Sequence, residues 1–337
     1  MVIMGWLKEI IAGLKGGPAY DLTFVPSIPA PDAGIDGIGR AVEVDSCYIE
    51  LYLESLRLAR ARKFATRFHA VAYSFVTLSR EGEERAQLAA VSKPEKLAEL
   101  DKDSLEHVIT ISKQIMGATP FRGGPVSIEL GLFSVKSGNV LTPLLDYVTR
   151  VSSTAGISFV GAIKPFLPLI TEGMDLIAGQ QQDTALEVGV ETDLTLNSGC
   201  VMAIIDRPKG SIDIEKLSLD KDRELLLDGK ILDCGYAVFS LRPTTEKSDF
   251  GEIPELKERY AAFISAINNG KIKDAQDALG AFRLATIASP DLINSDADRL
   301  VEKASQKYKK AFPPGGAATF ETKGVQVQSL SEIGLYD

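Results

Sequence analysis

The feature that most constrains the fold is the run from Phe68 to Leu78, which is dense in aromatic and β-branched residues. Side chains of this kind fit the pleated surface of a sheet, so the run predicts a central strand. Residues 48–53 fit either a strand or a helix. Further stretches of strand character lie at residues 21–25, 42–46, 86–91, 107–111, 126–135, 185–196, 201–206 and 236–241. We therefore expect a β-rich domain.

Turn chemistry places one hairpin and two loops. Asp228-Gly229 separates two apolar stretches within residues 225–232 and supplies the positive φ angles of a type I′ turn. Residues 26–39, rich in glycine and proline, predict a loop. Arg122-Gly-Gly-Pro predicts a tight entry into the strand that starts at Val126. Neither glycine-containing segment has the spacing of a phosphate-binding motif, so we interpret both as loops.

The sequence predicts three helical regions beside the strands. Residues 3–15 form a short amphipathic stretch that ends at Gly16-Gly17-Pro18. Residues 93–106 predict a short helix, whereas residues 141–155 and the proline-interrupted stretch 157–177 predict a helical insertion packed over the sheet. This insertion interrupts the β-rich domain.

After Pro254 the pattern becomes helical, with three apolar stripes that predict a three-helix unit. Asn269-Gly270 fits the end of the first helix. Ser295 opens the third, because Ser295-Asp-Ala-Asp298 has the form of a capping box.

The predicted fold class is α+β, an antiparallel β-sandwich with a helical insertion and a small helical unit. The segments are an amphipathic helix at 1–18, the sandwich at 19–250 with its insertion at about 137–180, helices at 251–312, and a flexible tail or late-added strand at 313–337.

Composition limits the partners and the compartment. The net charge of −9 argues against nucleic acid as the main partner, because binding there needs a basic surface. The three cysteines lack CxxC spacing, which favours free thiols in a reducing cytoplasm. We expect no signal peptide and no membrane-spanning helix, since no apolar run reaches about 20 residues.

Catalytic and metal-binding patterns are not recognisable in the sequence. The two histidines, His69 and His107, stand outside any nucleophile or metal motif. The acidic pairs Asp101/Asp103, Asp220/Asp222 and Asp296/Asp298 are better interpreted as turn and helix-start residues than as calcium ligands. We therefore expect no catalytic residues, no metal and no cofactor, with a hydrolase using His69 or His107 as a remaining alternative.

The amphipathic helix at residues 3–15 is the first candidate contact site. An apolar stripe beside an aromatic residue, with lysines opposite, is typical of helices that lie at a membrane surface. The same stripe fits docking on a protein partner or on the protein's own surface. The candidate contact residues are Ile3, Trp6, Leu7, Ile10, Ile11 and Leu14.

A basic run is the second candidate, as a contact for an anion or a partner. It consists of Arg57, Arg60, Arg62, Lys63 and Arg67, and Arg122 is added because it lies at a turn. Such a run suits phosphate groups of lipid or RNA. It also fits a solvated turn between two strands.

The stretch from Tyr48 to Val135 contains Arg67-Phe-His-Ala-Val-Ala-Tyr-Ser-Phe-Val and Pro120-Phe-Arg-Gly-Gly-Pro-Val-Ser-Ile-Glu-Leu-Gly-Leu-Phe. Its strand texture resembles C2-like β-sandwich accessory proteins of bacterial conflict, or antiviral defence, systems. The resemblance implies a non-catalytic domain that binds a membrane or a protein. The chain lacks the aspartate-rich loops of calcium-binding C2 domains, so calcium-dependent lipid binding is not implied.

Together these features predict a non-enzymatic bacterial binding or adaptor protein of the cytoplasm, acting through a protein partner and peripheral membrane contact. One alternative is a membrane-perturbing effector, in which the Trp6 helix and residues 157–177 act on lipid after proteolysis or a conformational change. The other is the unrecognised hydrolase.

Overall fold

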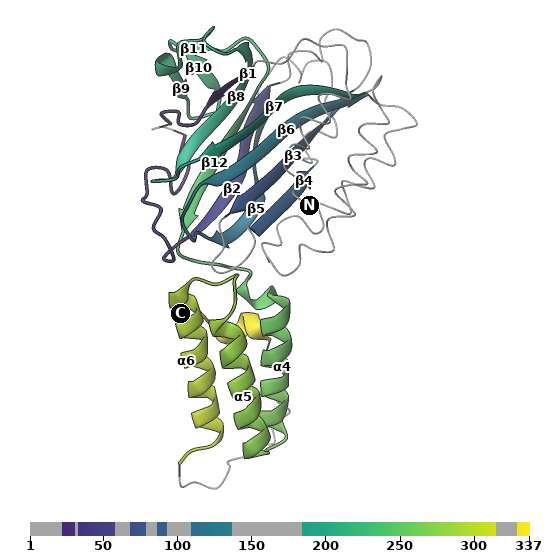
Figure 1. Ribbon diagram of the computed structural model, residues 1–337, viewed down its shortest axis with the longest axis vertical. Coiled ribbons are helices and arrows are strands. Elements are labelled where there is room, and N and C mark those ends of the chain that lie inside the picture. Colours follow the sequence, from purple (N-terminus) through teal and green to yellow (C-terminus); the bar gives the residue numbers. More distant parts are fainter. Residues whose placement is uncertain are drawn as a thin grey trace. The chain divides into compact units, whose positions relative to one another are not determined.

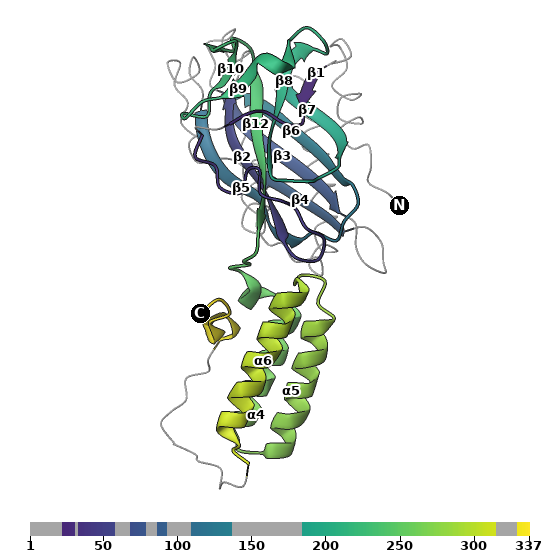
Figure 2. The same cartoon turned by 90° about the vertical axis from the view of Figure 1, so that its left-hand side faces the viewer.

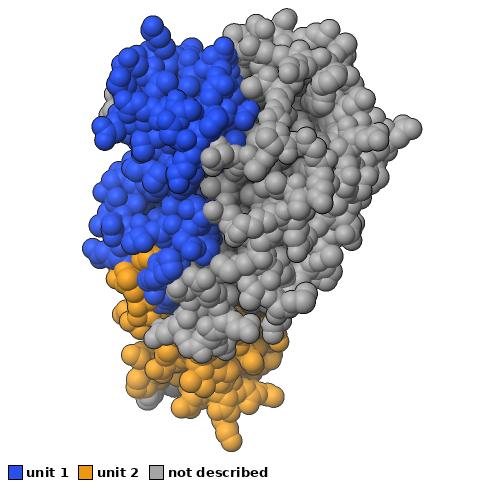
Figure 3. Space-filling view, turned by 45° about the horizontal axis from the view of Figure 1, so that its top comes forward, with its two compact units in different colours: residues 1–43, 49–117, 122–243 blue, residues 44–48, 118–121, 244–337 orange. Residues whose placement is uncertain are grey.

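The computed structural model describes residues 22–30, 33–57, 68–78, 86–92, 109–136, 184–314 and 329–337. Within these ranges the chain is α+β, with antiparallel sheets and three α-helices (Figure 1). It divides into two compact units, coloured in Figure 3. Unit 1 comprises residues 1–43, 49–117 and 122–243, and unit 2 comprises residues 44–48, 118–121 and 244–337.

A five-stranded sheet forms the first part of unit 1. Its order is β1-β8-β12-β2-β5. In the register, Phe24 of β1 pairs with Ile204 of β8, which also pairs with Ala237 of β12. The ambiguous stretch at 48–53 thus belongs to a strand. The strands are β1 (Leu22–Val25), β2 (Tyr48–Arg57), β5 (Ile109–Pro120), β8 (Cys200–Pro208) and β12 (Tyr236–Thr244).

A four-stranded sheet forms the second part, in the order β4-β3-β6-β7 (Figures 1 and 2). Tyr73 of β3 pairs with Val91 on one side and with Gly131 on the other. The predicted central position of residues 68–78 is therefore confirmed. The strands are β3 (Phe68–Leu78), β4 (Ala86–Ser92), β6 (Val126–Lys136) and β7 (Thr184–Leu194).

A small three-stranded sheet completes unit 1, preceded by the 3-10 helix η6 (Ile214–Lys216). It consists of β9 (Leu217–Leu219), β10 (Leu225–Leu227) and β11 (Lys230–Ile231). The predicted hairpin turn is confirmed, because Asp228 and Gly229 have φ angles of 53° and 75°. The small sheet shares an apolar core with β8 and β12, whose members include Val201, Ala203, Leu217, Leu225 and Val238.

Unit 2 contains the three predicted helices, α4 (Pro254–Asn268), α5 (Ile272–Ile287) and α6 (Asn294–Ala311), side by side in Figure 2. Two 3-10 helices accompany them, η7 (Phe250–Glu252) and η8 (Leu330–Ile333). Asn269 caps α4 and Gly270 has a φ of 67°, which confirms the predicted helix end. The helices bury Tyr260, Phe263, Ala275, Phe282, Leu300 and Ala304.

Three local predictions are corrected. Residues 42–46 do not form a strand: 42 and 43 are irregular, and 44–46 form a turn in which Asp45 has a φ of 60°. The N-cap of α6 is Ile293, without a side-chain cap hydrogen bond, so Ser295 lies inside the helix and is not its cap. Residues 330–333 form η8 and not the strand that we allowed for, and Leu330 and Leu335 are buried; the flexibility of the tail stays a prediction.

Several predicted elements lie outside the described residues. These are the helices at 3–15 and 93–106 and the insertion at 137–180. In the part of the chain that the structure describes, no helix combines the length and the hydrophobicity needed to cross a membrane.

Candidate functional site

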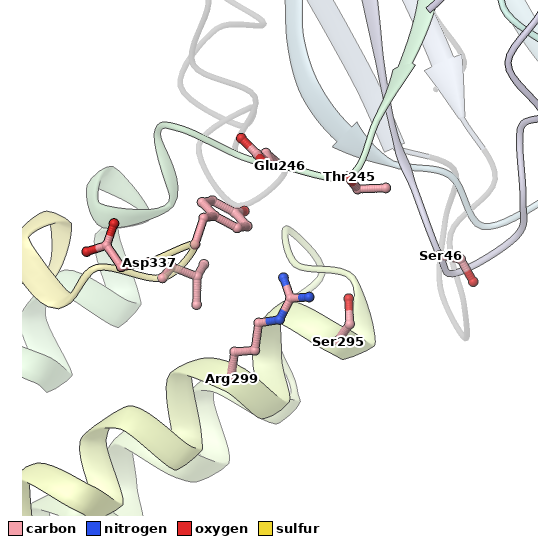
Figure 4. A pocket seen from close by; sticks show the side chains of 8 residues that line it. Ser46, Thr245, Glu246, Ser295, Arg299 and Asp337 are labelled. Carbon is pink, nitrogen blue, oxygen red and sulfur yellow. The ribbon is translucent and has the colours of Figure 1, made fainter.

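A pocket with a volume of about 510 Å³ opens on unit 2. It collects residues that are up to 291 positions apart, from the turn before β2, the segment after β12, the start of α6 and the end of the sequence (Figure 4). Most of the lining side chains are hydrogen-bonding groups. They are Ser46, Thr245, Glu246, Ser295, Arg299, Leu335, Tyr336 and Asp337.

A buried carboxylate lies beside this pocket. Asp296, in the first turn of α6, is 0% exposed. The hydroxyls of Tyr48 and Tyr336 each donate a hydrogen bond of 2.7 Å to the same oxygen, Oδ2. Arg299 Nη1 lies 3.3 Å from the other oxygen, Oδ1. The pocket-lining residues Tyr336 and Arg299 therefore connect the pocket to the buried charge.

Both tyrosine hydroxyls also accept hydrogen bonds from the backbone. Ile293 N–H donates to Tyr48 at 3.2 Å, and Lys247 N–H donates to Tyr336 at 2.6 Å. Burial, with the hydrogen bond to Asp296 next, raises the pKa of both phenols well above the ordinary value of 10. These hydroxyls consequently stay protonated at neutral pH and act as donors to Asp296.

Lys247 is a buried cation next to the Asp296 cluster. Its side chain is fully buried, and Nζ donates to the carbonyl of Ala118 at 2.6 Å and lies 3.1 Å from Asp249 Oδ1. The ammonium group also lies 5.8 Å from the ring centre of Tyr48. A buried cation needs such partners, because desolvating it alone is costly. Lys247 is thus held as a structural group.

Unit 1 contains a second buried carboxylate, Glu54 of β2, which is 0% exposed. Its Oε1 accepts hydrogen bonds from Arg242 and Ser240 on β12. Arg223 Nη1 lies 2.9 Å from Oε2, an ion pair without hydrogen-bond geometry. The Arg242 guanidinium also stacks 3.8 Å from the ring centre of Tyr52. The side chains of Arg223 and Arg242 are only 18% and 15% exposed, and together they compensate the buried charge of Glu54.

Burial raises the pKa of the Cys200 and Cys234 thiols to about 11, so both remain protonated and weakly nucleophilic at neutral pH. Among the residues described, no three His, Cys, Asp or Glu side chains gather in a form that could hold a metal ion. The pocket offers hydroxyls, one guanidinium and two carboxylates.

The predicted contact residues are placed only in part. All six N-terminal residues, and Arg60, Arg62, Lys63 and Arg67, lie outside the described ranges, as does His107. Arg57 is 8% exposed and donates to the Leu232 carbonyl at 2.6 Å and to Asp233 at 2.7 Å. Its guanidinium is therefore engaged inside unit 1.

Arg122 lies at the expected tight turn, where Gly123 and Gly124 have φ angles of 80° and 77° before β6 begins. Asp220 is a turn residue as interpreted, since its carboxylate accepts from the N–H groups of Asp222 and Glu224.

The sequence interpretation missed the pocket and the Asp296 cluster. One signal was available, because Asp296 stands four residues before Leu300 and eight before Ala304, on the buried stripe of α6. A charged residue on an apolar stripe needs internal partners. We had assigned it to a capping box instead.

Comparison of the chain with protein-family models, with curated proteins and with solved structures gives no match.

Proposed function

We propose that this chain is a non-enzymatic binding or adaptor protein, and that the unit 2 pocket docks a segment of a protein partner. The observation that carries the proposal is the pocket lining of four hydroxyl groups, one guanidinium and two carboxylates around a hollow of about 510 Å³. Such groups fit the amides and charged side chains of a peptide, which need partners when they leave water.

Arg299 is the principal anchor in this proposal. Its side chain is 52% exposed, and one edge of the guanidinium rests on Asp296. A planar guanidinium that is oriented in this way is suited to binding a carboxylate of the partner. Glu246, across the pocket in Figure 4, would accept a hydrogen bond from an N–H group of the same segment.

Exposed apolar side chains on α5 support partner docking. Leu284 and Ile287 are 73% and 63% exposed. Residues 288–293 connect α5 to α6, and the two helices run antiparallel, so these side chains lie at the same end of the helices as Ser295 (Figure 1). Apolar contacts beside a polar pocket are typical of protein interfaces.

The proposal also includes the fold type, the biological role, the N-terminal contact and the compartment that we expect from the sequence. The two larger antiparallel sheets are consistent with a C2-like sandwich, and the resemblance suggests a role in a bacterial antiviral defence system. The N-terminal stripe that contains Trp6 would provide peripheral membrane or partner contact. We place the protein in the cytoplasm.

Site-specific photo-crosslinking in cells tests the proposal. A photoreactive phenylalanine analogue at Ser295 should capture a defined protein, whereas the same residue at Glu258, on the exposed face of α4, should not. Arg299→Gln should lower the yield at Ser295 at least tenfold, which corresponds to about 1.4 kcal/mol. Equal adducts at Ser295 and Glu258, or a crosslinking yield at Ser295 that Arg299→Gln leaves unchanged, would contradict partner docking at the pocket.

A further inference from the structure

Residues 329–337, which we call the terminal segment, are held on unit 2 by side chains. Leu330 and Leu335 are 2% and 3% exposed, and the Tyr336 ring meets the Phe250 ring edge to face at 6.3 Å. Lys303 Nζ donates to the carbonyl of Gly334. The backbone hydrogen bonds from Glu332 to Ser329 and from Asp337 to Gly334 stay within the segment. The segment therefore docks much as a separate peptide would.

The surface of unit 2 that contacts this segment, which we call the groove, includes Lys247, Phe250, Gly251, Asp296 and Lys303. It contains a prepared acceptor for a hydroxyl group. Asp296 is held by Tyr48 and Arg299, both of which lie outside the terminal segment. The Tyr336 hydroxyl adds a second donor to Oδ2 and accepts from Lys247 N–H. Removing Tyr336 would leave the acceptor and the donor in place for another phenol.

One glycine brings the groove and the segment into close approach. A Cβ at Gly251, in η7, would lie 2.6 Å from Ser331 N and 2.7 Å from Ser331 Cα. Both are backbone atoms, so a larger residue would displace the segment. A Cβ at Gly280, on α5, would meet nothing within 4 Å. The chain thus offers a disruptive glycine variant and a matched control.

We propose that this groove of unit 2 is a peptide-binding groove and that the terminal segment is its internal occupant, exchangeable with a partner segment that presents a leucine followed by a tyrosine. The inference rests on the proposed function, because Leu335, Tyr336 and Asp337 line the same pocket. Partner docking would then compete with the terminal segment, which keeps the groove closed to weaker ligands.

Peptide binding to the full chain tests this inference. The probe is a fluorescent peptide of residues 329–337, acetylated and amidated, and its binding is measured by anisotropy. A chain with Leu335→Ala and Tyr336→Phe, whose own segment is weakened, should bind the peptide at least tenfold more tightly than the unaltered chain. Adding Gly251→Ala to this variant should abolish binding, whereas adding Gly280→Ala should not. A peptide carrying Tyr336→Phe should bind at least tenfold more weakly.

Failure of the peptide to bind the weakened chain, while α4, α5 and α6 keep their hydrogen-exchange protection, would overturn the inference. If the weakened chain loses that protection, the inference is tested by hydrogen exchange of the unaltered chain. Amides of the terminal segment should then exchange at least a hundredfold faster than those of α4, through local opening. Equal protection would show that the segment opens only with unit 2. Crosslinking at Ser295 detects a separate partner, so the two proposals can fail independently.

Discussion

The two units each bury a carboxylate, and they stabilise it in different ways. Glu54 in unit 1 is neutralised by the guanidiniums of Arg223 and Arg242, which are 18% and 15% exposed. Asp296 in unit 2 receives two neutral phenol hydroxyls, and its one cation, Arg299, is half exposed. The first cluster is an enclosed ion-pair network, whereas the second is connected to a pocket.

This difference separates a cluster enclosed within its unit from one that is connected to a pocket. In unit 1 two of the partners of Glu54 are on the neighbouring strand β12, and both cations are committed to it. In unit 2 the Tyr336 donor comes from a short segment that is docked by side chains. A hydroxyl donor can be replaced by another hydroxyl without leaving an uncompensated cation, which is what the proposed exchange of the terminal segment requires.

The largest expected effect concerns the ion-pair network. Glu54→Gln leaves the guanidiniums of Arg223 and Arg242 without their carboxylate, and we expect it to lower the free energy of unfolding of unit 1 by about 3 kcal/mol. Hydrogen exchange of the β2 and β12 amides measures this. Asp213→Asn is the control, because Asp213 and its partner Lys216 are each 55% exposed; it should cost less than about 1 kcal/mol. Equal losses would refute an enclosed network.

A smaller effect is expected at Asp296. Asp296→Asn keeps one oxygen acceptor but removes the charge, so the two phenols lose charge-assisted hydrogen bonds, and we expect a loss of about 2 kcal/mol in unit 2. Exchange of the α4 and α6 amides gives the value. Asp298→Asn, two residues along on the exposed face of α6, should change it by about 0.5 kcal/mol or less. A similar loss of stability in both variants would mean that the negative charge of Asp296 acts only on the start of the helix and not on the two phenols.

The smallest effect concerns the buried tyrosine Tyr260 of α4, whose hydroxyl has no hydrogen-bond partner among the described residues. Burial, and then the charge of Glu332, raise its pKa to about 12. Below pH 10 the folded and unfolded states both keep the proton. Above pH 10 only the unfolded state releases it, so this tyrosine lowers stability as the pH rises toward 12.

Tyr260→Phe removes this pH dependence and an unsatisfied hydroxyl. Between pH 9 and pH 11 the stability of the variant relative to the unaltered chain should rise by roughly 1 kcal/mol. Urea unfolding followed by circular dichroism at each pH gives the difference. A constant difference across this range would mean that Tyr260 titrates normally in the folded state.

Local patterns predicted much of the described fold. The run Phe68–Leu78 is an interior strand, Asp228-Gly229 forms the hairpin turn, and Asn269-Gly270 ends α4. These features depend on side-chain shape and on backbone angles of neighbouring residues. Residues 42–46, which include a turn at 44–46, were mispredicted as a strand. Alternation of apolar and polar residues cannot show whether a neighbouring strand is present to pair with them.

The candidate site was much less predictable. Ser46, Asp296 and Tyr336 are ordinary residues in their local sequence, and a capping box explained Asp296 without any distant partner. Only the long-range hydrogen bonds from Tyr48 and Tyr336, across 248 and 40 positions, reveal its role. The buried residues on α6 were the one local indication of such partners.

The sequence by itself determined the α+β class, the positions of many strands and the three helices, because these follow from hydrophobic periodicity and turn chemistry within short windows. The tertiary structure alone decided which polar groups are enclosed and which line a pocket. Burying Asp296 or Glu54 requires compensating donors, and chain folding brings those donors from distant positions. The distinction between an enclosed carboxylate and one that lies beside a pocket therefore arises from long-range contacts.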